Sequence, residues 1–359
     1  MKALRVGIIG ANAERGWARE SHVPAVRHLD GLELAAVANK GQEAADAAAA
    51  AFGASKAYGD AHALIADPDI DLVTVATTLL THRDLVGAAL AAGKHVYSEY
   101  PLGVGVGESE ALALAAAKAG VHSAIGLQAR GNPAVRRART LIAEGAIGRP
   151  LSVRAFSSTA GFGPVTQPTE AYTEDPATGV NLVTIQGAHT LDLVQALLGG
   201  FESLSALTTT QYPDIRIGDG APQPRRTADH LLVQARLLSG AAAAVEVIGG
   251  RPADTPFRLE VIGTGGTLTL LGGAMRGFQA GHLTLLLDGT AEAADATGDL
   301  AEGAANVAGL YADLRDDIER GTHTVTGFKH AVRLARLIDA TMRSAQEGRR
   351  VAHADLPTA

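Results

Sequence analysis

Short apolar runs alternate with helix-length segments through the first third of the chain. The apolar runs cover residues 4–11, 32–39, 71–77, 95–100 and 123–129, and segments of helical length lie between them at 41–52, 81–92 and 107–119. A strand that is buried on both faces is apolar along its whole length, and strands that alternate with helices pair in parallel through right-handed crossovers. The sequence therefore predicts an α/β domain with a doubly wound parallel sheet over residues 1–129.

The pattern changes after residue 150, where strand-like runs follow one another with few helices between them. Strand candidates are 152–158, 203–212, 230–238, 242–248, 258–262, 267–271 and 283–287, and helices are expected at 180–198, 304–320 and 327–347. Short glycine-containing turns such as 238–240 and 263–266 favour antiparallel hairpins. Residues 130–359 are therefore predicted to form an α+β domain with a large, mostly antiparallel open sheet.

Two further expectations concern this second domain. The segments 160–178 and 213–227 are polar and rich in proline and glycine, so we predict loops there. A broad sheet needs its second face covered, and we predict a homo-oligomer that forms through that face.

A glycine-containing loop, GANAERGW over residues 10–17, follows the first apolar run directly. Dinucleotide-binding Rossmann domains carry Gly-x-Gly-x-x-Gly here, because glycine permits the tight turn and lets backbone N–H groups approach the pyrophosphate. Asparagine at the second glycine position is a plausible replacement, since it tolerates positive φ better than most residues. We expect Gly10, Ala11, Asn12, Gly16 and Trp17 to contact a dinucleotide. The alternatives are a Rossmann domain that no longer binds one and, for Trp17, packing between domains.

The end of the second apolar run bears on the choice of cofactor. An acidic residue at this place would bind the ribose hydroxyls of NAD. This chain has Asn39 and Lys40 there, so no carboxylate repels a 2′-phosphate and Lys40 can pair with one. We expect both residues to contact the cofactor and NADP to be favoured slightly over NAD. A lysine that is merely solvated at a strand end gives the same pattern.

Composition argues against several other classes of function. Cysteine is absent, which excludes disulfides, thiolate nucleophiles and zinc–thiolate sites and fits a cytoplasmic protein. The formal net charge is −7 and no run of basic residues occurs, so we expect no nucleic-acid partner. No charge-free apolar stretch reaches about 18 residues, so we expect no membrane span. The histidines and carboxylates show no ligand spacing that indicates a metal site.

Three further motifs follow the glycine loop in order. They are Ala76-Thr77-Thr78 with His82, then Glu99-Tyr100-Pro101, then Gly187-Ala188-His189 with Asp192. With the glycine loop, this order resembles the glucose–fructose oxidoreductase, inositol dehydrogenase and rhizopine-catabolism (Gfo/Idh/MocA) family over nearly the whole chain. The resemblance implies a Rossmann domain followed by an open-sheet α+β domain. It also implies hydride transfer between NAD(P) and a sugar, polyol or related carbonyl compound.

A narrower resemblance indicates one branch of this family. The stretches that carry it are 16–25, 126–130, 179–184 and 229–232. They look like the branch that contains the fungal galactose-regulon repressor, which is a regulator. The resemblance therefore implies an NAD(P)-dependent oxidoreductase and, as the alternative, a catalytically silent NAD(P)-binding protein that regulates or senses.

The chain departs from the family pattern at two catalytic positions. The family's Glu-Lys-Pro motif reads Glu99-Tyr100-Pro101 here, and Ile185 stands where its Asp-x-x-x-His motif has aspartate. His189 remains, and an imidazole, with an ordinary pKa of about 6.5, suits proton transfer. We expect His189 to act as general base or acid and Tyr100 to orient the reacting oxygen. The alternatives are a structural histidine and an aromatic ring that fills the space of the missing lysine.

The resemblance also implies residues that bind cofactor and substrate. The cofactor candidates beyond the loop are Thr77, His82, Glu99, Tyr100 and Gln128. The substrate candidates are Gln128, Arg130, Asn181, Gln186 and His189. Gln186 and His189 are three residues apart on one expected helix, so they share a face. Asn181 lies where that helix begins, and it can cap the helix instead of contacting the substrate.

Overall fold

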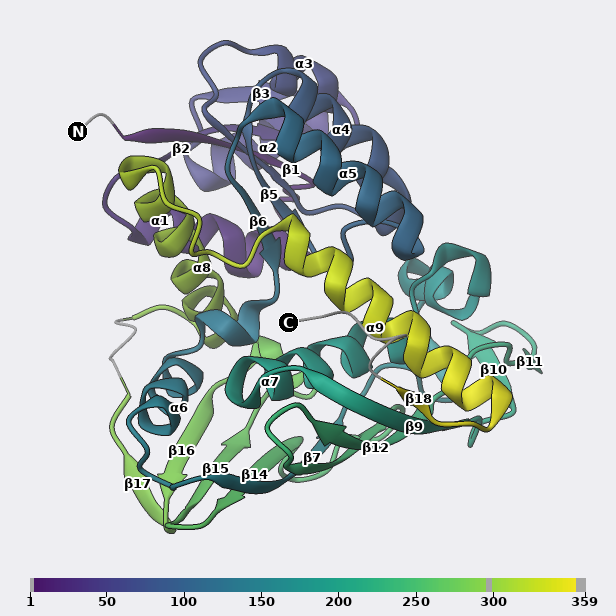
Figure 1. The fold of residues 1–359 in the computed structure, drawn as a ribbon. Coiled ribbons are helices and arrows are strands. Elements are labelled where there is room, and N and C mark those ends of the chain that lie inside the picture. The colour runs from purple at the N-terminus through teal and green to yellow at the C-terminus, as the bar shows by residue number, and fades with distance from the viewer. Residues whose placement is uncertain (1–2, 295–298, 353–359) are drawn as a thin grey trace. The chain divides into compact units, whose positions relative to one another are not determined.

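The computed structural model describes residues 3–294 and 299–352 of the chain. The chain divides into two compact units, both drawn in Figure 1. Unit 1 comprises Met1–Gly131 and Thr297–Val332, and unit 2 comprises Asn132–Ala296 and Arg333–Ala359. The first boundary lies close to the one predicted at 129, but the return of residues 297–332 to unit 1 differs from the predicted division.

Unit 1 is built on a six-stranded parallel sheet in the order β3-β2-β1-β4-β5-β6. The strands are β1 (Leu4–Ile9), β2 (Leu32–Ala38), β3 (Lys56–Tyr58), β4 (Leu72–Val75), β5 (His95–Glu99) and β6 (Ser123–Gly126). The predicted doubly wound sheet is thereby confirmed. The sequence pattern does not predict β3, because a three-residue strand that reads Lys-Ala-Tyr contains no apolar run.

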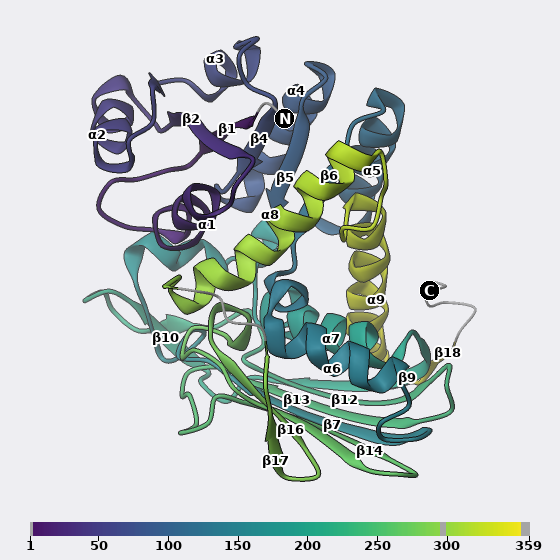
Figure 2. The same cartoon turned by 90° about the vertical axis from the view of Figure 1, so that its left-hand side faces the viewer.

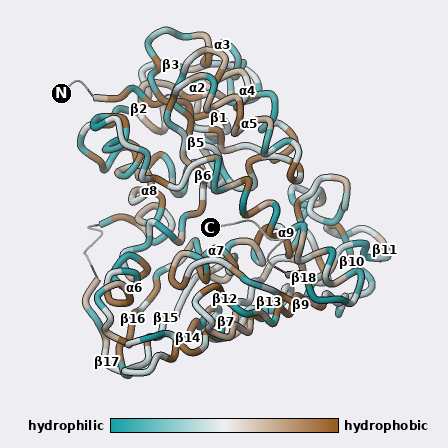
Figure 3. Tube along the Cα trace, in the orientation of Figure 1, coloured by the Kyte–Doolittle hydropathy of each residue, from teal (hydrophilic) through white to brown (hydrophobic). Residues whose placement is uncertain are grey.

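Helices connect these strands at the predicted places. The main connections are α2 (Gln42–Phe52), α4 (His82–Ala91) and α5 (Gly105–Ala119). The shorter helical segments are η1 (Ala18–His22), α1 (Val23–His28), α3 (Ala61–Ala66), η2 (Leu79–Thr81) and η3 (Gln128–Gly131). Figure 3 shows that strand β1 between these helices consists largely of hydrophobic residues, as a strand buried on both faces requires.

Helix α8 (Glu302–Arg320) accounts for the return of the C-terminal segment to unit 1. Its residues Leu310, Tyr311 and Leu314 are fully or almost fully buried in one hydrophobic cluster with residues of β1 and β2. The helix also contacts η1, α1 and η3. Periodicity predicts this helix from the sequence, but it does not reveal which sheet the apolar side of the helix covers. The following helix, α9 (Phe328–Glu347), begins in unit 1 and continues in unit 2.

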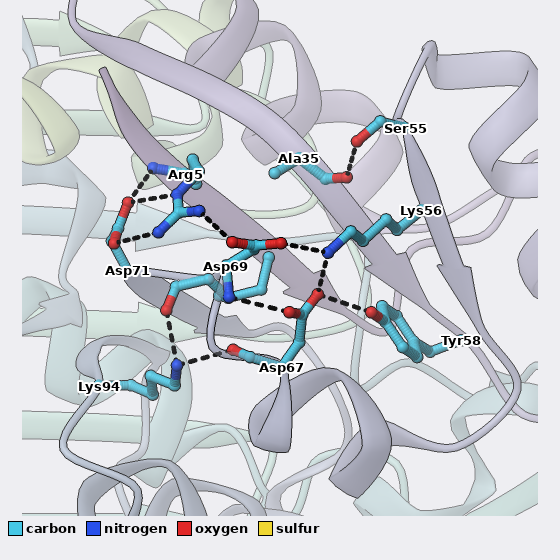
Figure 4. A network of polar contacts seen from close by, with 10 residues as sticks. Arg5, Ala35, Ser55, Lys56, Tyr58, Asp67, Asp69, Asp71 and Lys94 are labelled. Carbon is cyan, nitrogen blue, oxygen red and sulfur yellow. Dashed lines mark hydrogen bonds and ion pairs between the residues drawn. The ribbon is translucent and has the colours of Figure 1, made fainter. Parts of the chain in front are cut away.

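A polar network joins the segments at the N-terminal ends of the strands in unit 1, as Figure 4 shows. Arg5 donates from Nε and Nη2 to the two oxygens of Asp71, each at 3.0 Å. Asp67 accepts from Lys56 Nζ at 2.7 Å and from the Tyr58 hydroxyl at 2.6 Å. Burial opposes ionisation of Asp67, but these hydrogen bonds outweigh it and lower the pKa of Asp67 from 3.8 to about 2.

The lowered pKa makes the contribution of Asp67 to stability dependent on pH. A carboxyl with a depressed pKa in the folded state stabilises the protein above its unfolded pKa, and that contribution is lost as the pH falls through the folded pKa. We expect Asp67→Asn to reduce the free energy of unfolding most above about pH 4, with the difference from wild type shrinking toward about pH 2. Urea denaturation at a series of pH values measures this. Asp69→Asn, at a side chain that is 60% exposed, is the control with the smaller effect, and a difference independent of pH would contradict the assignment.

Unit 2 contains a nine-stranded sheet in the order β17-β16-β15-β14-β7-β13-β12-β9-β18. The strands are β7 (Pro150–Ser158), β9 (Phe201–Thr209), β12 (His230–Leu237), β13 (Ala242–Ile248), β14 (Phe257–Gly263), β15 (Thr267–Gly272), β16 (Leu283–Leu287), β17 (Thr290–Glu292) and β18 (Val351–Ala352). Only the pair β7–β13 is parallel among the described strands of this sheet. The predicted α+β unit with a mostly antiparallel sheet is confirmed.

Two helices, α6 (Pro133–Ala143) and α7 (Ala188–Leu198), lie along one face of this sheet, as Figure 2 shows. On β9 and β12, Leu207 and Leu232 are paired neighbours and remain 52% and 38% exposed. Exposed leucines on a sheet agree with the expected self-association through its open face. That association stays a prediction. None of the described helices is long and apolar enough to cross a membrane.

The two segments predicted as loops instead form a small second sheet, so that prediction is wrong in part. Its strands, in the order β11-β10-β8, are β8 (Val165–Thr166), β10 (Asp214–Ile217) and β11 (Gln223–Pro224). The 3₁₀ segments η4 (Pro168–Glu174) and η5 (Pro176–Thr178) follow β8. Strands of two to four residues leave no periodicity to detect, and the interactions that hold them are polar.

Arg225 is the centre of those polar interactions, with a side chain that is completely buried. Its Nε and Nη2 donate to the carboxylate of Glu174 at 3.1 and 2.9 Å, and its Nη1 donates to Asp229 at 2.9 Å. Its remaining N–H groups donate to the carbonyl oxygens of Phe162 and Gly163 at 2.7 and 2.6 Å. All five guanidinium donors are thus satisfied, and one side chain ties the two segments together.

We expect Arg225→Met to destabilise the protein by about 3–5 kcal/mol, because it leaves two buried carboxylates without their cation. Equilibrium urea denaturation measures the loss. The neighbouring Arg226→Met is the matched control. Arg226 is 69% exposed and lies 3.7 Å from Asp175, so its loss is expected to cost less than about 1 kcal/mol. Equal losses in the two variants would show that the buried cluster stabilises the protein no more than the exposed ion pair does.

Candidate functional site

The parallel strands of unit 1 bring their carboxyl ends to one edge of the sheet. In doubly wound sheets, ligands bind outside these ends near the point where the strand order reverses. That point lies here between β1 and β4. The cofactor residues predicted from the sequence end or follow β1, β2, β4, β5 or β6, so the structure places them along this edge.

Gly10 follows β1 at the reversal point. Its N–H donates to the Ala38 carbonyl at 2.9 Å, and its φ is +93°. A Cβ on Gly10 would lie 2.3 Å from the carbonyl oxygen of Ala76, so the ends of β1 and β4 approach each other in a way that only glycine permits. Gly16 has a φ of +99°, but nothing lies within 4 Å of where its Cβ would be. The conformation of Gly10 fits the tight turn that the first glycine of a pyrophosphate-binding loop makes.

The rest of the glycine loop is held by its own side chains. The amide oxygen of Asn12 accepts the N–H groups of Glu14 and Arg15 at 2.9 and 3.2 Å, so Asn12 shapes the turn. Trp17 immediately precedes the π-helical turn η1 and packs against the hydrophobic cluster of unit 1. Its carbonyl accepts the hydroxyl of Ser21 at 2.7 Å.

Asn39 follows the end of β2. Its Nδ2 donates to the carbonyl of Ala11 at 2.9 Å, and its Oδ1 accepts the N–H of Lys40 at 2.8 Å. The amide is thus used to join the ends of β1 and β2, while the side chain of Lys40 is exposed at the same edge. An exposed ammonium here leaves both predicted alternatives for Lys40 open.

Thr77 and His82 lie beyond the end of β4. The hydroxyls of Thr77 and Thr81 are 2.7 Å apart. His82 is almost fully buried, with Nδ1 2.9 Å from the Pro101 carbonyl and Nε2 3.2 Å from the Thr77 carbonyl. Burial lowers the pKa of His82, so the neutral ring donates to one of these two carbonyls. His82 therefore connects the segments that follow β4 and β5, a structural role that the sequence did not indicate.

Glu99, the last residue of β5, receives hydrogen bonds on both carboxylate oxygens. Gln128 Nε2 donates to Oε2 at 2.8 Å, and His22 Nε2 lies 3.0 Å from Oε1. His22 in turn contacts the hydroxyl of Tyr311 at 2.9 Å. The sequence analysis identified Glu99 and Gln128 but missed His22 and Tyr311. These lie far from Glu99 along the chain, and no local spacing marks them.

Tyr100 and Arg130 are the remaining predicted site residues of unit 1. Tyr100 is half-buried after β5, and its peptide bond to Pro101 is cis. Arg130 lies on η3, where its Nη2 is 3.1 Å from Nε2 of His330. Since a guanidinium only donates, His330 accepts through this nitrogen.

Three predicted residues belong to unit 2. Asn181 accepts the N–H groups of Val183 and Thr184 at 3.0 and 3.1 Å, so its amide oxygen caps the following helix. That helix begins with a π-helical turn, η6 (Val183–Gly187), and continues as α7. Gln186 therefore lies in the π turn and His189 in α7, so the two residues do not share the single regular α-helix predicted over 180–198.

Gln186 and His189 are both buried. Gln186 Nε2 donates to the carbonyl of Arg276 at 3.0 Å, and its Oε1 has no hydrogen-bond partner among the described residues. His189 lies in the first turn of α7. Within the described ranges, no group of three or more histidines, aspartates or glutamates is arranged to hold a metal ion.

Two family models together cover most of the chain. Residues 4–127 match the oxidoreductase family with an NAD-binding Rossmann fold, named GFO_IDH_MocA. Residues 133–272 match the model of the Gal80p C-terminal domain. These matches confirm the resemblance that the sequence motifs indicate.

Similar proteins include both a regulator and an enzyme. The galactose/lactose metabolism regulatory protein GAL80 of Saccharomyces cerevisiae is 29% identical over 311 residues, which cover 80% of this chain and 71% of that protein. Levoglucosan dehydrogenase of Pseudarthrobacter phenanthrenivorans is 27% identical over 291 residues, which cover 75% of this chain and 73% of that protein. A solved structure of a super-repressor mutant of Gal80p from Saccharomyces cerevisiae has a TM-score of 0.88 at 25% identity and covers 98% of both chains.

The close approach at Gly10 can be tested by substitution, and Gly16 in the same loop serves as the control. Gly10→Ala forces a Cβ into the Ala76 carbonyl and separates the ends of β1 and β4, so we expect a lower melting temperature and loss of dinucleotide binding. Gly16→Ala meets the same backbone strain without a clash, so its effect should be clearly smaller. Thermal unfolding with and without dinucleotide measures both. Similar losses in the two variants would contradict the role given to the contact with Ala76.

Proposed function

We propose that this chain, which belongs to the Gfo/Idh/MocA family of oxidoreductases, is an NAD(P)-dependent oxidoreductase acting on a sugar, polyol or related carbonyl compound. The observation that carries the proposal is the close approach of the ends of β1 and β4, where only glycine fits at position 10. The match of residues 4–127 to an NAD-binding family model supports it, as does the similarity to a sugar dehydrogenase.

The cofactor would lie along the carboxyl edge of the sheet in unit 1. The loop that contains Gly10 would hold the pyrophosphate, and Asn39 with Lys40 would face the adenosine ribose. Glu99 and Gln128 would face the nicotinamide half. The absence of a carboxylate beside Lys40 supports a preference for NADP over NAD. Bound nicotinamide supplies or accepts the hydride.

His189 is the residue to which we assign proton transfer. It would accept the hydroxyl proton when an alcohol is oxidised and return a proton when a carbonyl is reduced. Tyr100 would orient the reacting oxygen through its hydroxyl. The motif positions of the two residues support these roles, although Tyr100 replaces the family's lysine.

Gln186 is the substrate-binding candidate with the best geometric support. Its Nε2 is engaged by a backbone carbonyl, whereas its buried Oε1 has no partner in the described part of the chain. A buried acceptor without a donor is costly, and a sugar hydroxyl can supply that donor. Asn181 is a weaker candidate, because its amide oxygen already caps a helix.

The alternative is a catalytically silent protein that binds NAD(P) and acts as a regulator or sensor. Tyr100 and Ile185 favour it, because they replace two of the three catalytic groups of the family motif. The similarity to a regulatory protein and to the Gal80p C-terminal domain supports the same alternative.

Titration of Trp17 fluorescence with NAD⁺, NADH, NADP⁺ and NADPH, checked by calorimetry, tests the proposal first. We expect saturable binding, with NADPH tighter than NADH and the difference reduced in Lys40→Gln. A panel of sugars and polyols, followed by the absorbance of the reduced nicotinamide, then tests turnover. We expect His189→Ala to lower kcat by about 10²- to 10⁴-fold, as loss of a general acid–base does.

His62→Ala, at an exposed histidine of α3, is the control and should leave kcat unchanged. The absence of binding at millimolar concentrations of all four dinucleotides would overturn both the enzyme and the cofactor-dependent regulator. Binding without turnover on any substrate would favour the regulator. Turnover that survives His189→Ala intact would remove the catalytic role of that residue alone.

A further inference from the structure

A continuous chain of hydrogen bonds runs through the interior of unit 1 to the end of β5. Thr74 Oγ1 lies 2.7 Å from the hydroxyl of Tyr311, which lies 2.9 Å from Nδ1 of His22. His22 Nε2 lies 3.0 Å from Glu99 Oε1, and Glu99 Oε2 accepts from Gln128 Nε2 at 2.8 Å. The first three side chains are fully buried. The chain therefore joins β4, α8, η1, β5 and η3.

With a neutral imidazole at His22, the chemistry of the end group determines the direction of every bond. A carboxylate only accepts, so His22 must donate to Glu99 from Nε2. In the neutral ring Nδ1 is then an acceptor and requires the proton of the Tyr311 hydroxyl. Burial raises the pKa of Tyr311, so this hydroxyl keeps its proton and can donate it. Thr74 is left to donate to the oxygen of Tyr311.

We propose that His22 and Tyr311 are positioning residues that hold Glu99 as a fixed, acceptor-only carboxylate and thereby orient the amide of Gln128. With Glu99 ionised, Gln128 must present its NH₂ group to Oε2. Its carbonyl oxygen then points away from Glu99. The opposite amide orientation would place two acceptors against each other.

Gln128 Oε1 is the atom that this arrangement prepares for a ligand. The residue is 3% exposed, and Oε1 has no hydrogen-bond partner within the described ranges. A buried carbonyl oxygen of this kind requires a donor. At the edge assigned to the nicotinamide half, the matching donors are a carboxamide NH₂ or a ribose hydroxyl. This ligand assignment rests on the proposed function.

Gly126 provides an independent sign that the position of Glu99 is fixed. It is the last residue of β6 and pairs with Glu99 across the sheet. A Cβ on Gly126 would lie 2.6 Å from Glu99 Oε1 and 2.9 Å from its carboxyl carbon. The carboxylate therefore lies directly against the end of β6. Any residue larger than glycine at position 126 would occupy the space of the Glu99 carboxylate.

Tyr97 offers a matched control for Tyr311. Its ring is fully buried, stacks on Tyr311 with centroids 4.7 Å apart, and meets His22 edge-on at 5.0 Å. Its hydroxyl has no hydrogen-bond partner among the described residues. Tyr97→Phe and Tyr311→Phe thus remove the same atom from neighbouring rings, and only the second removal breaks the chain.

The experiment is nitrogen NMR of the full-length protein labelled with ¹⁵N-histidine, with the His22 signals assigned through His22→Gln. We expect the proton on Nε2 and a hydrogen-bonded Nδ1 in the wild type. Tyr311→Phe should move the Nδ1 resonance toward that of a free acceptor nitrogen, and Tyr97→Phe should not. In parallel, calorimetry with NADPH and NADH should show affinity lowered about threefold to tenfold in Tyr311→Phe and unchanged in Tyr97→Phe.

A doubly protonated His22, or identical Nδ1 resonances in the two phenylalanine variants, would overturn the hydrogen-bond chain. Unchanged cofactor affinity in a Tyr311→Phe protein that shows the nitrogen shift would overturn the link to Gln128. If the wild type binds no dinucleotide, the proposed function and the ligand role of Gln128 both fail. In that case the nitrogen resonances still decide whether His22 and Tyr311 fix Glu99.

Discussion

The burial of the Tyr311 hydroxyl is the interaction on which the rest of unit 1 depends. A phenol in the interior must satisfy its oxygen, and Tyr311 does so between Thr74 of β4 and His22 of η1. This fixes the rotation and position of α8 against the sheet. The same hydrogen bonds position the carboxylate of Glu99 at the end of β5, because His22 contacts both Tyr311 and Glu99. Hydrophobic burial brings the helix to the sheet, and the polar contacts define where it stops.

The sequence predicts the elements of this fold far better than their association. Apolar runs locate five of the six parallel strands, and hairpin turns locate the main strands of the second sheet, because each signal is local. The small sheet that contains β8 and β10 escapes prediction, since Arg225 holds it through partners scattered between residues 162 and 229. The motif resemblance identifies Glu99 and Gln128. His22 and Tyr311 are identified only from the folded structure, because their contacts join residues that lie far apart in the sequence.

The chain keeps the close approach of the strand ends but departs from the family motif at two positions. Gly10 and Asn39 still bring the ends of β1, β2 and β4 together. Tyr100 and Ile185, by contrast, stand where the family motif has lysine and aspartate. In a fold of this kind, cofactor binding and chemistry use different residues, so one can be retained while the other changes. Similarity to both a dehydrogenase and a regulator agrees with that separation.

The discontinuous make-up of unit 1 has a consequence for the way the protein is made. Its core includes residues of α8, which the ribosome adds only after nearly all of unit 2. At synthesis rates of about 5–20 residues per second, the strands of the first sheet must wait on the order of ten seconds for that helix. During this interval an apolar surface and the imidazole of His22 remain uncovered. The nascent chain is therefore most exposed to misassembly or chaperone capture before the residues of α8 appear.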